Sequence, residues 1–227
     1  MMAEAVIAVR GGPTSKSRCA AALPPGDRSL LTQLMLQDMI AAATRTASLA
    51  RIWVVTPTES LAIFARRNGA RVIEQTSQGL NAAFALALDV IGQTAPYAPV
   101  ALLPGDLPLL RPDDVEAAVA LTQSAEVVLS PACSDGGTGA IVLRAGVRLP
   151  LAYGPDSFAR HRRGAVAAGL SASLFEAASL GRDIDRPEDL AFLIENHRDT
   201  AAGAFLRSRM GARGVGGTGI WDLQGAP

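Results

Sequence analysis

Short apolar runs alternate along the chain with longer segments in which apolar positions recur at helical spacing. The short runs predict strands at residues 5–9, 52–56, 71–74, 100–103, 127–130 and 140–143. The longer segments predict helices at about residues 29–48, 58–68, 80–93, 112–124, 157–169 and 187–196. Two helix starts are well marked, because Pro112 and Pro187 are each followed by two acidic residues, as is typical of a first helical turn.

The predicted strands are continuous apolar runs and do not alternate with polar residues. Such runs are typical of strands that are covered on both faces, as in a parallel sheet. Because strands and helices alternate, we expect an α/β fold, a three-layer α/β/α sandwich with a mainly parallel central sheet.

The periodic pattern ends near residue 200. We therefore expect a single domain over residues 1–200, followed by a Gly-rich C-terminal tail over residues 201–227 that packs at most through Trp221. The glycines of this segment follow no predicted strand, so a phosphate loop is not expected there.

Composition narrows the class of protein. Hydrophobic residues make up 49% of the 227 residues, which is enough to form a core without disulfides. The 21 basic residues are balanced by 21 acidic residues, which argues against a nucleic-acid partner. No apolar run reaches the roughly 18 residues of a membrane helix, and the apolar part of the N-terminus is too short for a signal peptide. We expect a cytoplasmic protein in which Cys19 and Cys133 are free thiols.

In open parallel sheets, ligands bind beyond the carboxyl ends of the strands, so we expect the functional residues directly after the strands. The loop "RGGPTSKSRC" (10–19) follows the first strand, and its backbone N–H groups could cradle phosphates while Lys16 and Arg18 supply charge. It lacks the spacing of GxxxxGK[ST] and of GxGxxG, and an ordinary polar loop is the alternative.

Three aspartates are candidate ligands for Mg²⁺. Asp106 follows a buried strand in "PGDLPLL", where a metal ligand and a turn residue are both common. Asp183 and Asp185 flank an apolar residue in "GRDIDRPEDL", so their side chains share a face in an extended segment and would repel without a cation between them. Asp185 could alternatively cap the helix that begins at Pro187.

Other polar positions leave two interpretations open. Thr138 could donate to an anion or finish a turn, and Ser157 could bind an anion at a helix start or only cap that helix. Gly154 allows a ligand close to the backbone, and Asn81, after Gly79, could cap a helix or contact a nucleobase. His161 and His197 have no metal-ligand partner at useful spacing, so we expect both at the surface.

Taken in order, the segments "KSR", "GLN", "PGDLPLL", "GGT", "GPDSFARH" and "DIDRPEDL" resemble the CofC/FbiD family over about residues 5–195. This is a family of guanylyltransferases that act on small phosphorylated acids in coenzyme F-420 biosynthesis. The resemblance implies a Rossmann-like fold similar to that of nucleotide-diphospho-sugar transferases. It also implies transfer of GMP from GTP to the phosphate of phosphoenolpyruvate, 2-phospho-L-lactate or 3-phosphoglycerate, with release of pyrophosphate.

The resemblance also implies roles for individual residues. Mg²⁺ would be held by Asp106, Asp183 and Asp185, and the phosphorylated acid would be bound by Thr138, Gly154 and Ser157. Lys16 would neutralise GTP phosphates, and Lys16 and Asp106 would be the catalytic residues. The nucleotide side would comprise Arg10, Gly11, Lys16, Arg18, Gly79 and Asn81.

The sequence departs from the family pattern at two positions, and two other functions remain open. Arg10 stands where members of that family commonly carry lysine. Thr138 is followed by Gly139 and not by the asparagine that is usual in the family, which leaves the identity of the phosphorylated acid open. The first alternative is a molybdenum-cofactor or sugar-phosphate nucleotidyltransferase of the same fold. The second is a catalytically silent binding protein. The oligomeric state is also open, with a homodimer as one expectation.

Overall fold

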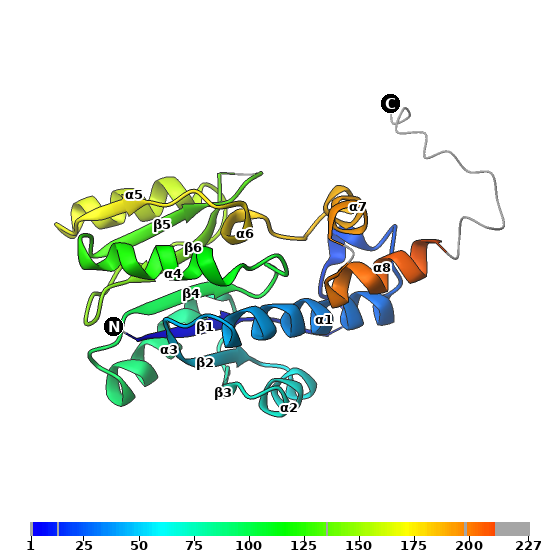
Figure 1. Cartoon of the computed structure of the whole chain (residues 1–227), viewed down its shortest axis with the longest axis horizontal. Helices are drawn as coiled ribbons and strands as arrows, with labels where there is room; N and C mark the ends of the chain where they lie inside the picture. Colours follow the sequence, from blue (N-terminus) through cyan, green and yellow to red (C-terminus); the bar gives the residue numbers. More distant parts are fainter. Residues whose placement is uncertain (1, 13, 135, 198, 212–227) are drawn as a thin grey trace.

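The computed structural model describes residues 2–12, 14–134, 136–197 and 199–211. Within these residues, seven strands form one sheet in the spatial order β3-β2-β1-β4-β6-β5-β7 (Figure 1). The strands are β1 (Ala3–Ala8), β2 (Leu49–Thr56), β3 (Arg71–Glu74), β4 (Val100–Pro104), β5 (Val127–Pro131), β6 (Thr138–Leu143) and β7 (Ala172–Leu174). All six strands predicted from sequence are present. The short strand β7 was missed because it is largely exposed and has no apolar run.

The sheet is mainly parallel, as predicted, and β6 is the exception. β1 pairs in parallel with β2 and β4, β2 with β3, and β5 with β7, whereas β6 runs antiparallel to both β4 and β5. A parallel neighbour needs a crossover of a dozen or more residues, and only residues 132–137 separate β5 from β6. The short connection therefore forces a hairpin, and it brings the first residue of β6 to the edge where the parallel strands end.

The helices are α1 (Pro25–Thr44), α2 (Glu59–Arg67), α3 (Leu80–Thr94), α4 (Pro112–Ala120), α5 (Ser157–Ala167), α6 (Ala178–Gly181), α7 (Pro187–Asn196) and α8 (Ala201–Gly211), with short 3-10 helices η1 (Ser17–Cys19) and η2 (Leu121–Gln123). Helix α1 begins four residues before its predicted start, because Pro25 is tolerated at the first helical position. None of the described helices combines the length and apolar character that spanning a membrane requires.

Two apolar layers cover the sheet, which confirms the three-layer sandwich. Alternate residues of β1 point to opposite sides: Ile7 belongs to an apolar cluster that includes residues of α1, α2 and α4, whereas Val6 belongs to a cluster that includes residues of α3 and α5. Because both faces are covered, all six residues of β1 are buried.

A third apolar cluster lies beyond the sheet, where α7 and α8 pack beside α1 (Figure 1). Residues 201–211, which sequence assigned to a Gly-rich tail, form α8. Ala202 and Leu206 are fully buried, and the carboxylate of Asp38 accepts hydrogen bonds from the backbone N–H groups of Ala201 and Ala202 (2.8 and 3.0 Å). The rest of that segment, including Trp221, lies outside the described residues.

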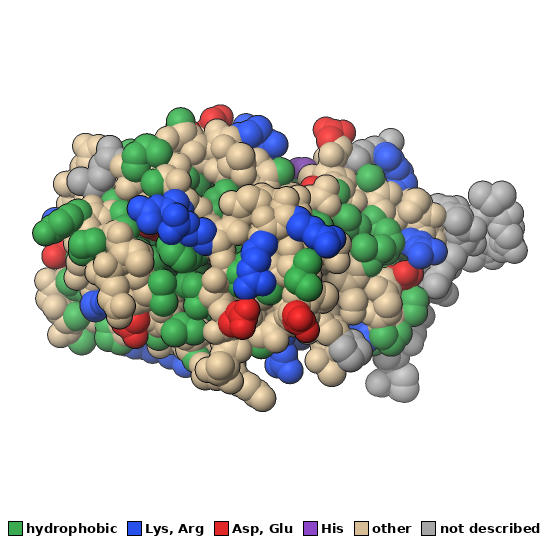
Figure 2. Space-filling model, turned by 90° about the horizontal axis from the view of Figure 1, so that it is seen from below, with side chains coloured by type: hydrophobic (Ala, Val, Ile, Leu, Met, Phe, Trp, Pro, Cys, Tyr) green, Lys and Arg blue, Asp and Glu red, His purple; other side chains and the backbone are tan. Residues whose placement is uncertain are grey.

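The charged surface agrees with the balanced composition. On the face shown in Figure 2, Lys and Arg side chains are interspersed with Asp and Glu side chains and do not gather into one basic surface.

Candidate active site

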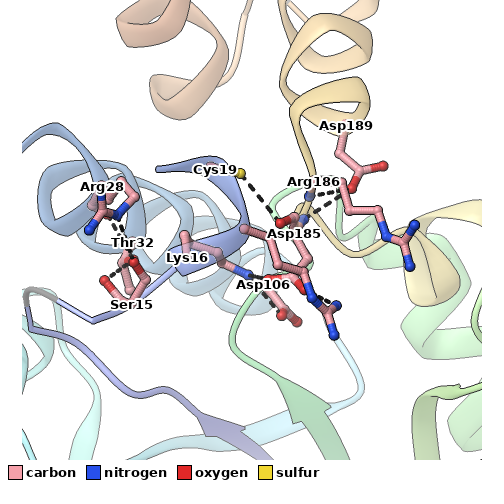
Figure 3. A network of polar contacts seen from close by, with 10 residues as sticks. Ser15, Lys16, Cys19, Arg28, Thr32, Asp106, Asp185, Arg186 and Asp189 are labelled. Atoms are coloured by element: carbon pink, nitrogen blue, oxygen red, sulfur yellow. Dashed lines mark hydrogen bonds and ion pairs between the residues drawn. The ribbon is translucent and has the colours of Figure 1, made fainter. Parts of the chain in front are cut away.

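The loop after β1 is held against α1 by a buried arginine. Arg28, 7% exposed, donates from Nε to the carbonyl of Ser15 (3.1 Å) and from Nη1 to that of Leu23 (2.8 Å). Lys16 follows in the left-handed conformation (φ 49°, ψ 43°) immediately before η1. This turn directs the Lys16 side chain toward the end of β4 (Figure 3).

Lys16 lies between two of the predicted aspartates. Its Nζ is 2.9 Å from Oδ2 of Asp106 and 3.6 Å from Oδ1 of Asp185, and the Lys16 side chain is only 9% exposed. Arg18 pairs with the other carboxylate oxygen of Asp185. Burial alone would lower the pKa of Lys16, but the negative charges of Asp106, Asp185 and Asp183 together raise it, so Lys16 is a cation at neutral pH.

Asp106 reaches this position because Gly105 has no side chain. The N–H of Gly105 donates to the carbonyl of Ala8 (2.8 Å), and a Cβ at residue 105 would lie 2.5 Å from Cβ of Val9. Only glycine allows β4 to end against β1 so closely. The carbonyl of Asp106 then accepts a hydrogen bond from the N–H of Ile184 (3.0 Å), which ties the "DID" segment to the same point.

The start of α7 is capped by Asp189 and not by Asp185. The Asp189 carboxylate accepts hydrogen bonds from the backbone N–H groups of Asp185 (3.1 Å) and Arg186 (2.8 Å). The side chain of Asp185 is therefore free of capping and pairs with the two cations (Figure 3). Cys19 donates to the carbonyl of Asp185 (3.3 Å), and burial raises the pKa of this thiol to about 11. Cys19 therefore supports the segment as a protonated thiol.

The three aspartates meet only part of the requirements of a metal site. Among the described residues, no group of three or more His, Cys, Asp and Glu side chains is arranged to hold a metal ion. Two features nevertheless fit Mg²⁺: carboxylates are its usual protein ligands, and Oδ1 of Asp106 is buried without a hydrogen-bond partner. In the present arrangement the ammonium of Lys16 supplies the positive charge between Asp106 and Asp185.

A pocket of about 390 Å³ opens beside Asp106. Its walls come from the ends of β1 and β4 and from the segment before α3, and they include three of the predicted site residues, Arg10, Gly79 and Asp106. Two of the predicted nucleotide residues thus lie together in this pocket.

Gly11 and Asn81 have structural partners instead. The N–H of Gly11 donates to Oγ1 of Thr58 (3.2 Å), and a Cβ at residue 11 would lie 2.7 Å from Leu61. The amide of Asn81 donates to the carbonyl of Tyr153 (3.2 Å) and accepts from its N–H (2.7 Å). Asn81 therefore joins α3 to the "YGPDS" turn, and its amide is not directed into the 390 Å³ pocket.

The residues predicted to bind the acid form a second polar group. Ser157 Oγ accepts a hydrogen bond from the backbone N–H of Thr138 (2.8 Å) and lies 3.2 Å from Oγ1 of Thr138. Gly154 has φ 125°, and its carbonyl accepts from the N–H of Ser157 (3.1 Å). Both hydroxyls are nearly buried, with Thr138 6% and Ser157 2% exposed.

The antiparallel direction of β6 places this second group beside the first. Leu102 of β4 pairs with Ile141 of β6 in antiparallel register, so β6 begins, at Thr138, on the edge of the sheet where β4 ends. Thr138 and Asp106 therefore lie at the same edge of the sheet. The structure thus brings the predicted metal, lysine and acid residues to one edge of the sheet.

His161 was expected at the surface, and this is wrong, because the residue is fully buried. Its Nδ1 lies 2.8 Å from Oγ1 of Thr138, its Nε2 accepts from the N–H of Ala152 (2.9 Å), and Tyr153 packs edge-on against the ring. The signal that could have found it is spacing, since His161 lies four residues after Ser157 and thus on the same helix face.

The fold is shared with solved structures described as nucleotidyltransferases. A Desulfovibrio desulfuricans G20 protein assigned as a nucleotide-diphospho-sugar transferase superposes with a TM-score of 0.78 at 18% identity, covering 93% of this chain and 96% of that one. A nucleotidyl transferase from Methanothermobacter has a TM-score of 0.64 at 17% identity, covering 91% and 99%. At these identities the likeness establishes the fold alone.

Sequence comparison identifies the family. Residues 3–212 match the family described as guanylyl transferase CofC like, and the chain belongs to this family. A 3-phospho-D-glycerate guanylyltransferase from Phenylobacterium zucineum is 51% identical over 191 residues, which cover 83% of this chain and 88% of that protein. A phosphoenolpyruvate guanylyltransferase from Rubrobacter xylanophilus is 37% identical (83% and 92% covered), and a 2-phospho-L-lactate guanylyltransferase from Methanothermobacter thermautotrophicus is 30% identical (89% and 89%).

Proposed function

We propose that this protein transfers GMP from GTP to the phosphate of a small phosphorylated acid and releases pyrophosphate, in the biosynthesis of coenzyme F-420. The observation that carries the proposal is the cluster of Lys16, Asp106 and Asp185 beside a pocket at the carboxyl edge of the sheet. Membership of a guanylyl transferase family supports the same reaction.

The reaction suits a site without a strong general base. The phosphate of the acid is already ionised at neutral pH, and one of its oxygens attacks the α-phosphorus of GTP. A phosphorus–oxygen bond forms there while the bond from the α-phosphorus to the oxygen bridging to the β-phosphate breaks, and pyrophosphate leaves. The main obstacle is repulsion between two anions, which cations in the site reduce.

Each group of residues has a proposed task. Lys16 neutralises phosphate charge, and Arg10 and Gly79 bind the nucleotide from the walls of the 390 Å³ pocket. Asp106 and Asp185, with Asp183, would hold Mg²⁺, which when bound stabilises charge on phosphate oxygens. The orphan Oδ1 of Asp106 supports this assignment.

For the acid, we propose binding at Thr138, Gly154 and Ser157, with 3-phosphoglycerate as the preferred acceptor. The preference rests on similarity, since the relative named for 3-phospho-D-glycerate is 51% identical and the relatives named for the other two acids are 37% and 30% identical. Because GTP and such acids are cytoplasmic metabolites, we place the reaction in the cytoplasm.

The test is pyrophosphate release from GTP and Mg²⁺ with 3-phosphoglycerate, phosphoenolpyruvate and 2-phospho-L-lactate in separate reactions. We expect the highest kcat/KM with 3-phosphoglycerate and a guanosine diphosphate-linked acid in the mass spectrum. Faster release with another acid would correct the acceptor. Release with none of the three, while GTP still binds, would contradict the proposed reaction and favour a pterin or sugar-phosphate acceptor.

A further inference from the structure

The buried ring of His161 connects the backbone at Ala152 with the hydroxyl of Thr138. The N–H of Ala152 donates to Nε2 (2.9 Å), and Nδ1 lies 2.8 Å from Oγ1 of Thr138. A backbone N–H can only donate, so Nε2 must accept and carries no proton. A neutral ring then has its proton on Nδ1, and Nδ1–H donates to Oγ1 of Thr138.

The ring is neutral at neutral pH. Burial, and secondly the positive charge of Arg160, lower the pKa of His161 to about 4. A protonated ring would also direct an N–H against the N–H of Ala152. The hydrogen bonds and the burial therefore favour a single state, the neutral ring with its proton on Nδ1.

This state fixes how the two hydroxyls can be used. Thr138 Oγ1 accepts from His161, Ser157 Oγ accepts from the backbone N–H of Thr138, and the two hydroxyls share one hydrogen bond between them. Two hydroxyls carry two protons, and the bond between them uses one. Among the described residues neither hydroxyl has a further acceptor, so one O–H remains available to donate to a ligand.

The opposite tautomer would remove this donor. If Nδ1 accepted, the O–H of Thr138 would donate to the ring and the O–H of Ser157 would donate to Thr138. Both protons would then be used inside the protein, and lone pairs would face an incoming anion. The N–H of Ala152 thus decides, through the ring, whether the pair attracts or repels an anionic ligand.

We propose that His161 is a positioning residue that holds the Thr138–Ser157 pair with one O–H free to donate to an oxygen of the phosphorylated acid. This inference rests on the proposed function, since it concerns the acid of that reaction. The direction of β6 supports it, because β6 runs antiparallel to β4 and therefore begins, at Thr138, on the edge of the sheet where β4 leads into Asp106.

Two substitutions separate positioning from simple filling of space. The amide of an Asn side chain lies near the place of Nδ1, and that of Gln near the place of Nε2. His161→Asn can therefore still donate to Thr138, whereas His161→Gln can hold only the N–H of Ala152. His197→Gln, which replaces a half-buried histidine at the end of α7, is the matched control.

The experiment has two readouts. ¹⁵N NMR of the imidazole in the substrate-free protein reports which nitrogen of His161 carries the proton, and no activity is needed. Steady-state pyrophosphate release then gives KM for 3-phosphoglycerate and for GTP in each variant, with thermal melting as a check of folding.

We expect a proton on Nδ1 in the wild-type protein. His161→Gln should raise KM for the acid by roughly ten- to one hundredfold, the value of a hydrogen bond to a charged group, and leave KM for GTP within about twofold. His161→Asn should stay within about threefold of the wild type for both substrates, as should His197→Gln.

Three results would overturn the proposal: a proton on Nε2, equal effects of Asn and Gln on KM for the acid, or an equal rise in KM for GTP. Absence of turnover by the wild-type protein with all three acids would instead refute the proposed function, and the inference about the acid with it. The NMR result would then show separately whether the hydrogen bonds of His161 are as described.

Discussion

Replacing Lys16 by methionine removes the cation that separates Asp106 from Asp185 and keeps a side chain of similar length. The Nζ–Oδ distance of 2.9 Å corresponds to an attraction on the order of 6 kcal/mol at an effective dielectric constant of about 20, before the cost of desolvation is subtracted. Breaking a buried ion pair by removing one partner usually costs about 3–5 kcal/mol, because the remaining charge stays unpaired.

In this structure the energetic cost of breaking the ion pair is smaller, because the two aspartates are partly exposed. The side chains of Asp106 and Asp185 are 28% and 27% exposed, so water can screen them once the lysine is gone. We therefore expect Lys16→Met to lower the free energy of unfolding by about 2–3 kcal/mol. For a protein of this size that corresponds to a fall in Tm of about 4–12 °C.

The matched control is Arg66→Met. Arg66 pairs with Glu74 at the same distance of 2.9 Å, but its side chain is 51% exposed and that of Glu74 is 74% exposed. Exposed pairs of this kind contribute about 0–1 kcal/mol. Thermal and urea denaturation, with EDTA present to exclude divalent cations, measure both variants. If Lys16→Met destabilises the protein no more than Arg66→Met, the cluster is not the electrostatic unit described above.

Three further predictions concern turnover, packing and pH. Asp106→Asn should keep the fold but lower kcat/KM by roughly 10²-fold or more in the pyrophosphate assay, because a ligand charge is lost, and normal turnover would show that Asp106 holds no metal. Gly139→Ala should lower the free energy of unfolding, measured by urea denaturation, by more than about 2 kcal/mol, because the added Cβ would overlap the carbonyl oxygen of Leu180. The control Gly26→Ala adds a Cβ in open space and should be neutral or slightly stabilising, so equal effects of the two substitutions would contradict the packing argument. The pKa of His161 is lowered from 6.5 to about 4 in the folded state, so the neutral ring contributes up to about 3 kcal/mol to the free energy of unfolding above pH 6.5, and this contribution is lost as the pH falls toward 4. The free energy of unfolding of His161→Asn should lack this part of the pH dependence, and identical pH profiles for variant and wild type would refute the prediction.

Much of the site could be predicted from local sequence because its geometry is local. A buried run followed by Pro104-Gly105 places Asp106 at the end of a strand, and parallel strands bring such ends together. The same argument placed Lys16 at this edge, whereas Asp183 and Asp185 were singled out because alternate side chains of an extended segment share a face. For Asp106 and Lys16 the neighbouring residues in the chain determine the position of the side chain, whereas Asp185 is also held by the hydrogen bond between the N–H of Ile184 and the carbonyl of Asp106.

The rest depends on partners that are distant in sequence. The N–H groups that start α8 are bound by Asp38, so the helix forms although its own sequence is rich in small residues. His161 reads as a surface residue on a helix that carries exposed arginines, until the hydroxyl of Thr138 and the N–H of Ala152 meet its two nitrogens. No local pattern specifies those contacts.

The reversed strand β6 has a consequence for how this family can diversify. In the proposed function, the nucleotide side of the site is built on β1, β4 and the start of α3, whereas the acid side is built on the β5–β6 hairpin and the turn that leads into α5. Substitutions or length changes in the hairpin can reshape one side while the other keeps its geometry. Relatives named for three different acids, at 51%, 37% and 30% identity, are what such modular inheritance would produce.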